Sequence, residues 1–145
     1  MDWNEENKAE AFQRICEHIS EGNSLRSALG LHDTPSRRTF YSWLENDEKK
    51  VEQYARACEE RAEFHFEEIF EIADDSSADK KILKDGTEVT DHEAIQRSRL
   101  RVDTRKWALS KMQPKKYGDK IDVTTDGEKI NNDFTYNVVS NSKDG

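Results

Sequence analysis

The stretch that decides the fold is residues 48–73, which read EKKVEQYARACEERAEFHFEEIFEIA. It contains neither glycine nor proline, and its apolar residues return every three or four positions, as on one face of an α-helix. The residues of this stripe are Val51, Ala55, Cys58, Ala62, Phe66, Ile69 and Ala73, and Phe64, Phe70 and Ile72 widen it toward the C-terminal end. Such a helix is roughly 35–40 Å long. We therefore predict a long central helix that packs against other subunits as well as its own chain.

Three shorter helices are predicted before it. A glycine ends each of the first two, and Asn23 or Ser24 can cap the second. Thr34 is the expected N-cap of the third helix, with Pro35 at its first helical position. The residues assigned to their shared core are Phe12, Ile15, Leu25, Phe40, Trp43 and Leu44, and further apolar positions of the first two helices are Cys16, Ile19, Ala28 and Leu29. Two helices, a glycine-containing turn and a third helix form the layout of a helix-turn-helix.

The outer face of the third predicted helix is polar, as in a helix that reads DNA. Arginine can bind guanine or phosphate, and hydroxyl groups add hydrogen bonds. The residues assigned to DNA contact are Ser36, Arg37, Arg38, Thr39, Tyr41 and Ser42, with Arg26, Lys49 and Lys50 as candidates for contacts to the DNA backbone. The same side chains could instead only solvate the outside of a helical bundle. Residues 1–47 carry 5 basic and 9 acidic groups, which argues against strong non-specific binding by one copy.

The chain is then predicted to turn back along the long helix. Residues 76–92 are a polar connector in which Asp85-Gly86 forms a hairpin turn between two short arms. A helix follows from Asp91 to Met112 and ends before Pro114. The apolar face of this helix is formed by Ile95, Val102, Leu109 and Met112, with Leu100 and Trp107 beside it.

A basic stripe runs along this returning helix. Arg97, Arg101 and Arg105 recur at every fourth position and could follow DNA phosphates. Residues 97–120 carry 9 basic and 2 acidic groups, whereas residues 48–75 carry 4 and 10. We favour the interpretation that the two long helices attract each other through these opposite charges.

The end of the chain is predicted to form two short strands. Ile121 and Val123 alternate with polar residues, Asp126-Gly127 is a turn signal, and Phe134, Tyr136 and Val138 alternate again. Two strands cannot close a core alone, but strands from several subunits could join into one barrel. Residues 141–145 are expected to be disordered.

The predicted protein is thus mainly α-helical, with an antiparallel pair of long helices as its oligomerisation core. Residues 1–50 form the DNA-binding head, 51–113 the oligomerisation domain, and 114–140 the β-strand segment. The residues assigned to contacts between subunits are Phe64, Phe66, Ile69, Phe70, Val102, Trp107 and Leu109.

Composition excludes several classes of protein. The chain has 145 residues, a formal net charge of −8 and 37% charged residues, against roughly 25% in an average domain. No apolar run approaches the roughly 18 residues that a membrane helix needs. Cys16 and Cys58 form no CxxC pair, so we expect neither a zinc site nor a disulfide framework. We therefore expect the protein to work in a reducing compartment. Neither nucleotide-binding glycine motif is present. We expect no cofactor, no metal, no catalytic residue and no membrane partner.

Four stretches of the sequence resemble the small subunit of tailed-bacteriophage terminases. They read TFYSWL at 39–44, FEEIFEIAD at 66–74, RLRVDTRKWAL at 99–109 and PKKYGDK at 114–120. The resemblance implies a ring-forming, non-catalytic protein of the host cytoplasm. Such a protein binds the packaging-start site on double-stranded viral DNA and presents it to the large subunit, which carries ATPase and nuclease. The connector at 76–92 is longer than in that family, and the tail is divergent.

Two other classes stay open. One is a dimeric helix-turn-helix transcription regulator. The other is a nuclease that uses Glu67, Glu68 and Glu71, although the exposed face of a long helix needs such charges in any case.

Overall fold

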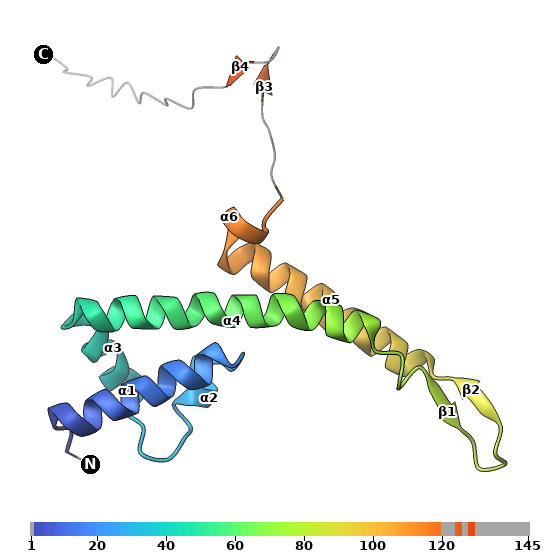
Figure 1. Cartoon of the computed structure of the whole chain (residues 1–145), viewed down its shortest axis with the longest axis horizontal. Coiled ribbons are helices and arrows are strands. Elements are labelled where there is room, and N and C mark those ends of the chain that lie inside the picture. The colour runs from blue at the N-terminus through green and yellow to red at the C-terminus, as the bar shows by residue number, and fades with distance from the viewer. Residues whose placement is uncertain (1, 120–123, 126–127, 130–145) are drawn as a thin grey trace, which may run out of the picture.

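The computed structural model describes residues 2–119, 124–125 and 128–129. One long helix, α4 (Glu48–Asp74), runs through the described molecule. Helices α1 (Glu5–Ser20) and α3 (Arg37–Glu45) lie against its N-terminal half, and the short helix α2 (Leu25–Ala28) packs on α1, so that the three form a compact head. Helix α5 (His92–Met112) runs back along its C-terminal half, and together they form an arm (Figure 1).

The first three helices begin at side-chain caps. Asn4 and Asn7 form a reciprocal capping box at the start of α1, and Ser24 accepts a hydrogen bond from the backbone N–H of Ser27 at the start of α2. Helix α3 begins at Arg37, so the prediction of Thr34 as its N-cap is wrong. The N-cap is Ser36, whose Oγ accepts from the backbone N–H of Thr39 at 3.2 Å.

Thr34 has a different role because its hydroxyl donates to carbonyl oxygens that precede it in the chain, instead of accepting a hydrogen bond from the first turn of α3. It lies 2.9 Å from the carbonyl oxygen of Leu29 and 2.7 Å from that of Leu31, so it closes the turn that precedes α3. Pro35 consequently stands before the N-cap and is buried, and it does not occupy the first helical position.

The head has one core, and α4 takes part in it. Phe12, Ile15, Ile19 and Phe40 are fully buried, and the rings of Phe12 and Phe40 stack with their centroids 5.5 Å apart. Ala57 of α4 is buried in the same cluster, and Tyr54 and Cys58 pack against it. Burial raises the pKa of the Cys16 thiol to about 12, so this thiol stays protonated within the core. The expected domain boundary at residue 50 thus falls within the first turn of α4, a helix that shares the core of the head.

The buried face of α4 differs in part from the predicted stripe. Val51 and Ala55 are exposed, whereas Tyr54 and Ala57 face the head. Ala62, a member of the stripe, and Ile72, at its widened end, are both buried as predicted. Phe66, another member of the stripe, is exposed. On the side that faces the head, the ring of Tyr54 packs edge-on against Phe40, with centroids 5.4 Å apart.

The arm is held by a small apolar seam and a charged cluster. Ile72 and Leu109 are buried between α4 and α5. Arg105 donates from Nε and Nη2 to the two carboxylate oxygens of Glu68, at 2.9 and 3.3 Å, and His65 Nδ1 lies 2.9 Å from Glu68 Oε2. Such a two-point contact is geometrically specific. The hydrogen bonds from Arg105, and then the one from His65, lower the pKa of the Glu68 carboxyl.

The basic stripe of α5 is therefore divided. Arg105 reaches across to α4, whereas Arg97 pairs with Glu93 one turn earlier on its own helix, at 3.6 Å. Charge complementarity between the long helices accounts for one member of the stripe, and the other two, Arg97 and Arg101, remain exposed.

A hairpin stands at the far end of the arm (Figure 1), as the sequence predicts. Strands β1 (Lys80–Ile82) and β2 (Glu88–Thr90) pair antiparallel, with Lys81 opposite Val89. Gly86 has φ +85°, the left-handed conformation that a tight turn demands of one residue.

The chain folds back on α4 after α5. Helix α5 ends before Pro114, as predicted, but Pro114 begins a further one-turn helix, α6 (Pro114–Tyr117). Tyr117 packs against Phe66 with ring centroids 5.3 Å apart, and Lys116 pairs with Glu63. Both contacts tie α6 to the middle of α4.

Two-residue strands β3 (Thr124–Thr125) and β4 (Glu128–Lys129) pair antiparallel after α6. The second of these was not among the predicted strands. The predicted strand at 134–138, residues 121 and 123, the turn at 126–127 and the tail at 141–145 lie outside the described residues.

The Glu68 cluster predicts an effect on stability. We expect Glu68→Gln to lower the free energy of unfolding by roughly 1 kcal/mol, because one carboxylate accepts from both Arg105 and His65. The exposed neighbour change Glu67→Gln should be nearly neutral. Urea unfolding at equal protein concentration measures both.

The same pair gives a dependence on pH. Because the folded-state pKa of Glu68 is lowered, its contribution is present above the ordinary value of 4.5 and is lost as pH falls through the folded-state value. The difference between wild type and Glu68→Gln should therefore shrink on acidification. A difference that is constant down to strongly acidic pH would contradict this assignment.

Candidate nucleic-acid interface

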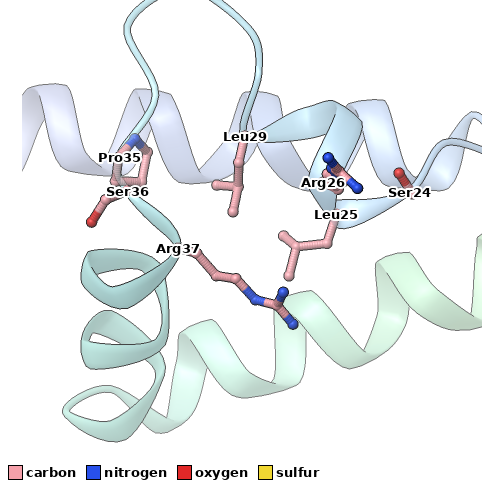
Figure 2. Close-up of a pocket in the computed structure, with 7 residues that line it drawn as sticks. All are labelled: Ser24, Leu25, Arg26, Leu29, Pro35, Ser36 and Arg37. Carbon is pink, nitrogen blue, oxygen red and sulfur yellow. The ribbon is translucent and has the colours of Figure 1, made fainter.

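A cleft lies between α2 and the start of α3 in the head. It has a volume of about 520 Å³ and brings together segments from both sides of the intervening turn (Figure 2). Its lining residues are Ser24, Leu25, Arg26, Leu29, Pro35, Ser36 and Arg37. Two of them are arginines that the sequence assigned to DNA contact.

Helix α3 presents its polar side chains because its apolar side is anchored. Phe40 and Trp43 are buried against the head, which leaves Arg37, Arg38 and Tyr41 on the exposed side. The guanidinium carbon of Arg37 lies 5.7 Å from the centre of the Tyr41 ring, so the ring supports the arginine one turn earlier. Predicted residues Ser36 and Thr39 meet through their hydroxyl oxygens at 2.9 Å and form the helix cap.

The turn between α2 and α3 is built by a residue that sequence reasoning missed. Arg14 of α1 donates from Nη2 to the carbonyl oxygens of His32 and Asp33, at 2.9 and 2.6 Å. Asp33 has φ +55°, a conformation that a non-glycine residue adopts only when its surroundings hold it. No local pattern reveals such a contact because Arg14 and the turn are about eighteen positions apart.

The cleft is locally basic within an acidic chain. From Gly22 to Leu44 the sequence contains three arginines and one carboxylate, that of Asp33. This carboxylate lies 2.7 Å from the Nδ1 atom of its neighbour His32. The overall charge of −8 therefore does not describe this surface.

The other predicted DNA contacts lie away from the cleft. Lys49 and Ser42 are exposed but do not line it. Lys50 is only 16% exposed, donates to Asp47 at 2.9 Å and covers the ring of Phe12. That hydrogen bond lowers the pKa of the Asp47 carboxyl. Lys50 is thus engaged within its own chain.

A second surface, apolar instead of basic, lies on the arm. We define the aromatic surface as Phe66, Phe70, Trp107 and Tyr117. Phe66 contacts Phe70 with centroids 5.4 Å apart, and a cleft of about 410 Å³ separates Phe66 and Tyr117 from Trp107. Phe70 is 56% exposed and Trp107 64% exposed, which is unusual for residues with such large apolar area.

The remaining residues predicted to contact other subunits are occupied within the chain. Leu109 is buried, and Ile69 and Val102 are half-buried between α4 and α5. The ring of Phe64 lies against Gly22 of the head.

The described residues contain no group of three or more His, Cys, Asp or Glu side chains that could hold a metal ion. Glu68, one carboxylate of the nuclease alternative, is engaged by Arg105. Within this part of the chain no helix has the length and apolar character to cross a membrane.

Comparison with known proteins gives one consistent result. Residues 7–124 match the family model described as bacteriophage Sf6, terminase small subunit-like. Three crystal structures of single-substitution variants of the terminase small subunit gp1 of bacterial virus Sf6 are similar to the chain. One is 36% identical with a TM-score of 0.59, covering 96% of this chain and 97% of that one. The others are 40% and 39% identical with TM-scores of 0.58 and 0.59, each covering 86% and 88% of the two chains. No curated protein matches significantly.

The corrected start of α3 can be tested directly. We expect Ser36→Ala to lower the free energy of unfolding by about 1 kcal/mol, because it removes the acceptor for the Thr39 N–H. Ser42→Ala on the exposed side of the same helix should have little effect. Chemical unfolding of the two variants measures the difference in free energy of unfolding. Equal stability of the two variants would show that Ser36 is not the N-cap that stabilises α3.

Proposed function

The chain belongs to the Sf6-like terminase small subunit family of phage packaging proteins, and from this membership we propose that it is the DNA-recognition subunit of its terminase. In this proposal it binds the packaging-initiation site on double-stranded viral DNA through α2 and α3, as a ring of identical copies. It presents that DNA in the host cytoplasm to the large subunit, which supplies ATP hydrolysis and cleavage. The subunit itself has no catalytic role and needs no cofactor.

The observation that carries the proposal is the basic cleft on the head of a chain whose net charge is −8. Arg26 and Arg37 face one recess from two helices, and Arg38 stands exposed beside them. An α-helix with its side chains is roughly 10–12 Å in diameter, so the nine-residue helix α3 can enter the major groove, which is about 12 Å wide. Its first turn holds two arginines and no acidic residue, which suits an approach to phosphate.

A single copy offers few such contacts, so multiple copies are part of the proposal. Three arginines give modest affinity at physiological salt, since non-specific binding depends on the number of phosphates neutralised. Heads that are linked in one assembly gain through effective concentration without any new contact. The aromatic surface provides the apolar area for that linkage, because Phe70 and Trp107 are largely exposed among the described residues of one chain.

The DNA surface is tested by reversing charges. Arg37→Glu together with Arg38→Glu should abolish binding to a duplex at moderate salt and leave the size of the assembly unchanged, because both side chains point away from the core. The slope of log affinity against log salt should fall by up to about 0.9 for each lost phosphate contact. Fluorescence anisotropy over a salt series gives both quantities.

A matched control uses the exposed arginines of the arm. Arg97→Glu together with Arg101→Glu makes the same change in charge on α5 and should reduce affinity much less. If this second pair abolishes binding and the first does not, the DNA surface lies on the arm.

The assembly surface is tested separately. Phe70→Asp should reduce the assembly to smaller species, since burying one phenylalanine contributes roughly 1.5–3 kcal/mol at every interface. Ile82→Asp, at a hairpin position that is 77% exposed, is the control and should leave the assembly intact. Light scattering measures the mass of both. An assembly of full size from Phe70→Asp would place the interface elsewhere.

A further inference from the structure

The turn between α1 and α2 has an unusually close contact with α4. Gly22 has φ +96°, and its backbone N–H donates to the carbonyl of Ile19 at 3.0 Å. A Cβ atom built on Gly22 would stand 2.5 Å from Cε1 of Phe64, closer than any real side chain tolerates. The Phe64 ring therefore occupies the space that every other residue would need at position 22.

The next residue of the turn is held by the same face of α4. Arg61 donates from Nη1 to the carbonyl oxygen of Asn23 at 3.3 Å, and Arg61 and Phe64 are three residues apart on one side of the helix. The side chain of Asn23 donates to the carbonyl of His18, so it closes the end of α1. We call Arg61 and Phe64 the seat of the turn.

The seat connects the two surfaces of the molecule. Ser24, which caps α2, follows the turn directly, and Arg26 lies two residues beyond it. On the other side, α4 continues without a break from Phe64 to the aromatic surface at Phe66 and Phe70. A change in how the turn rests on the seat thus moves the start of α2, and Arg26 with it, relative to α4.

We propose that Gly22 and Phe64 are positioning residues for DNA binding. They fix the start of α2 against α4, so that Arg26 keeps its place across the basic cleft from Arg37 in every copy of an assembly. This inference rests on the proposed function. When the turn is released from the seat, the core of the head stays folded around Phe12 and Phe40, but each head binds DNA less well, and linkage multiplies that loss over the copies that bind simultaneously.

The test uses two glycines with the same backbone constraint. Gly22→Ala adds a methyl group against Phe64, whereas Gly86→Ala adds one at φ +85° with no atom within 4 Å. Any general effect of an alanine at positive φ appears in both variants, and only Gly22→Ala disturbs the seat. Phe64→Ala removes the seat from the other side.

Three readouts are taken on the full chain. Hydrogen exchange should become faster in peptides that cover residues 18–30 and 52–66 of Gly22→Ala and Phe64→Ala. It should be unchanged at residues 37–45, which report the folded core of the head. Affinity for a duplex, by anisotropy, should fall about tenfold or more, while light scattering shows the same mass as wild type. Gly86→Ala should match wild type in all three.

The double variant separates positioning from general damage. Phe64→Ala removes the ring with which the added methyl group of Gly22→Ala would clash. The two changes together should therefore weaken DNA binding no more than Phe64→Ala alone. Additive losses, or equal affinity and exchange for Gly22→Ala and Gly86→Ala, would overturn the inference. If the proposed function is wrong, the result is different, because the wild-type protein itself then does not bind DNA.

Discussion

Helix α4 packs against different partners on its two halves, and the rest of the fold depends on that double packing. Tyr54 and Ala57 face the head, whereas Glu68 and Ile72 face α5. The helix is continuous over 27 residues and contains no glycine or proline that would allow it to bend. The basic cleft and the aromatic surface are therefore carried by one rigid element, even though the head and the arm have separate cores.

This arrangement gives a physical reason for a subunit that works in copies. The head has a compact core of aromatic and aliphatic side chains, but the arm buries little more than Ile72 and Leu109 within the described residues. Large apolar side chains such as Phe70 and Trp107 stay uncovered. A surface of this kind is suited to contact between copies, and linked heads would compensate for the few arginines that each one offers.

Local sequence patterns predicted the elements well, because caps, turns and periodicity act over a few residues. The helices of the head, the Asp85-Gly86 hairpin and the two long helices lie where those patterns indicate. Four features of the site and its surroundings were not predicted, and only one of them, the contact of Arg14 with the turn, joins residues far apart in the sequence. The other three are contacts between residues three to five positions apart, and residue types alone do not fix their direction. Thr34 bonds backward to the turn, Ser36 caps α3, Arg14 builds the turn from a distant helix, and Lys50 is occupied by Asp47.

The buried face of α4 was predicted only in part. Tyr54 is not part of the predicted apolar stripe, yet its ring packs edge-on against Phe40, while Val51 of the stripe is exposed. Native mass spectrometry of the intact assembly tests the central claim, that one chain is an incomplete unit, most directly. The account predicts a single species whose mass equals that of several copies of the 16.9 kDa chain. A monomer or a dimer at the concentrations where DNA is bound would contradict it.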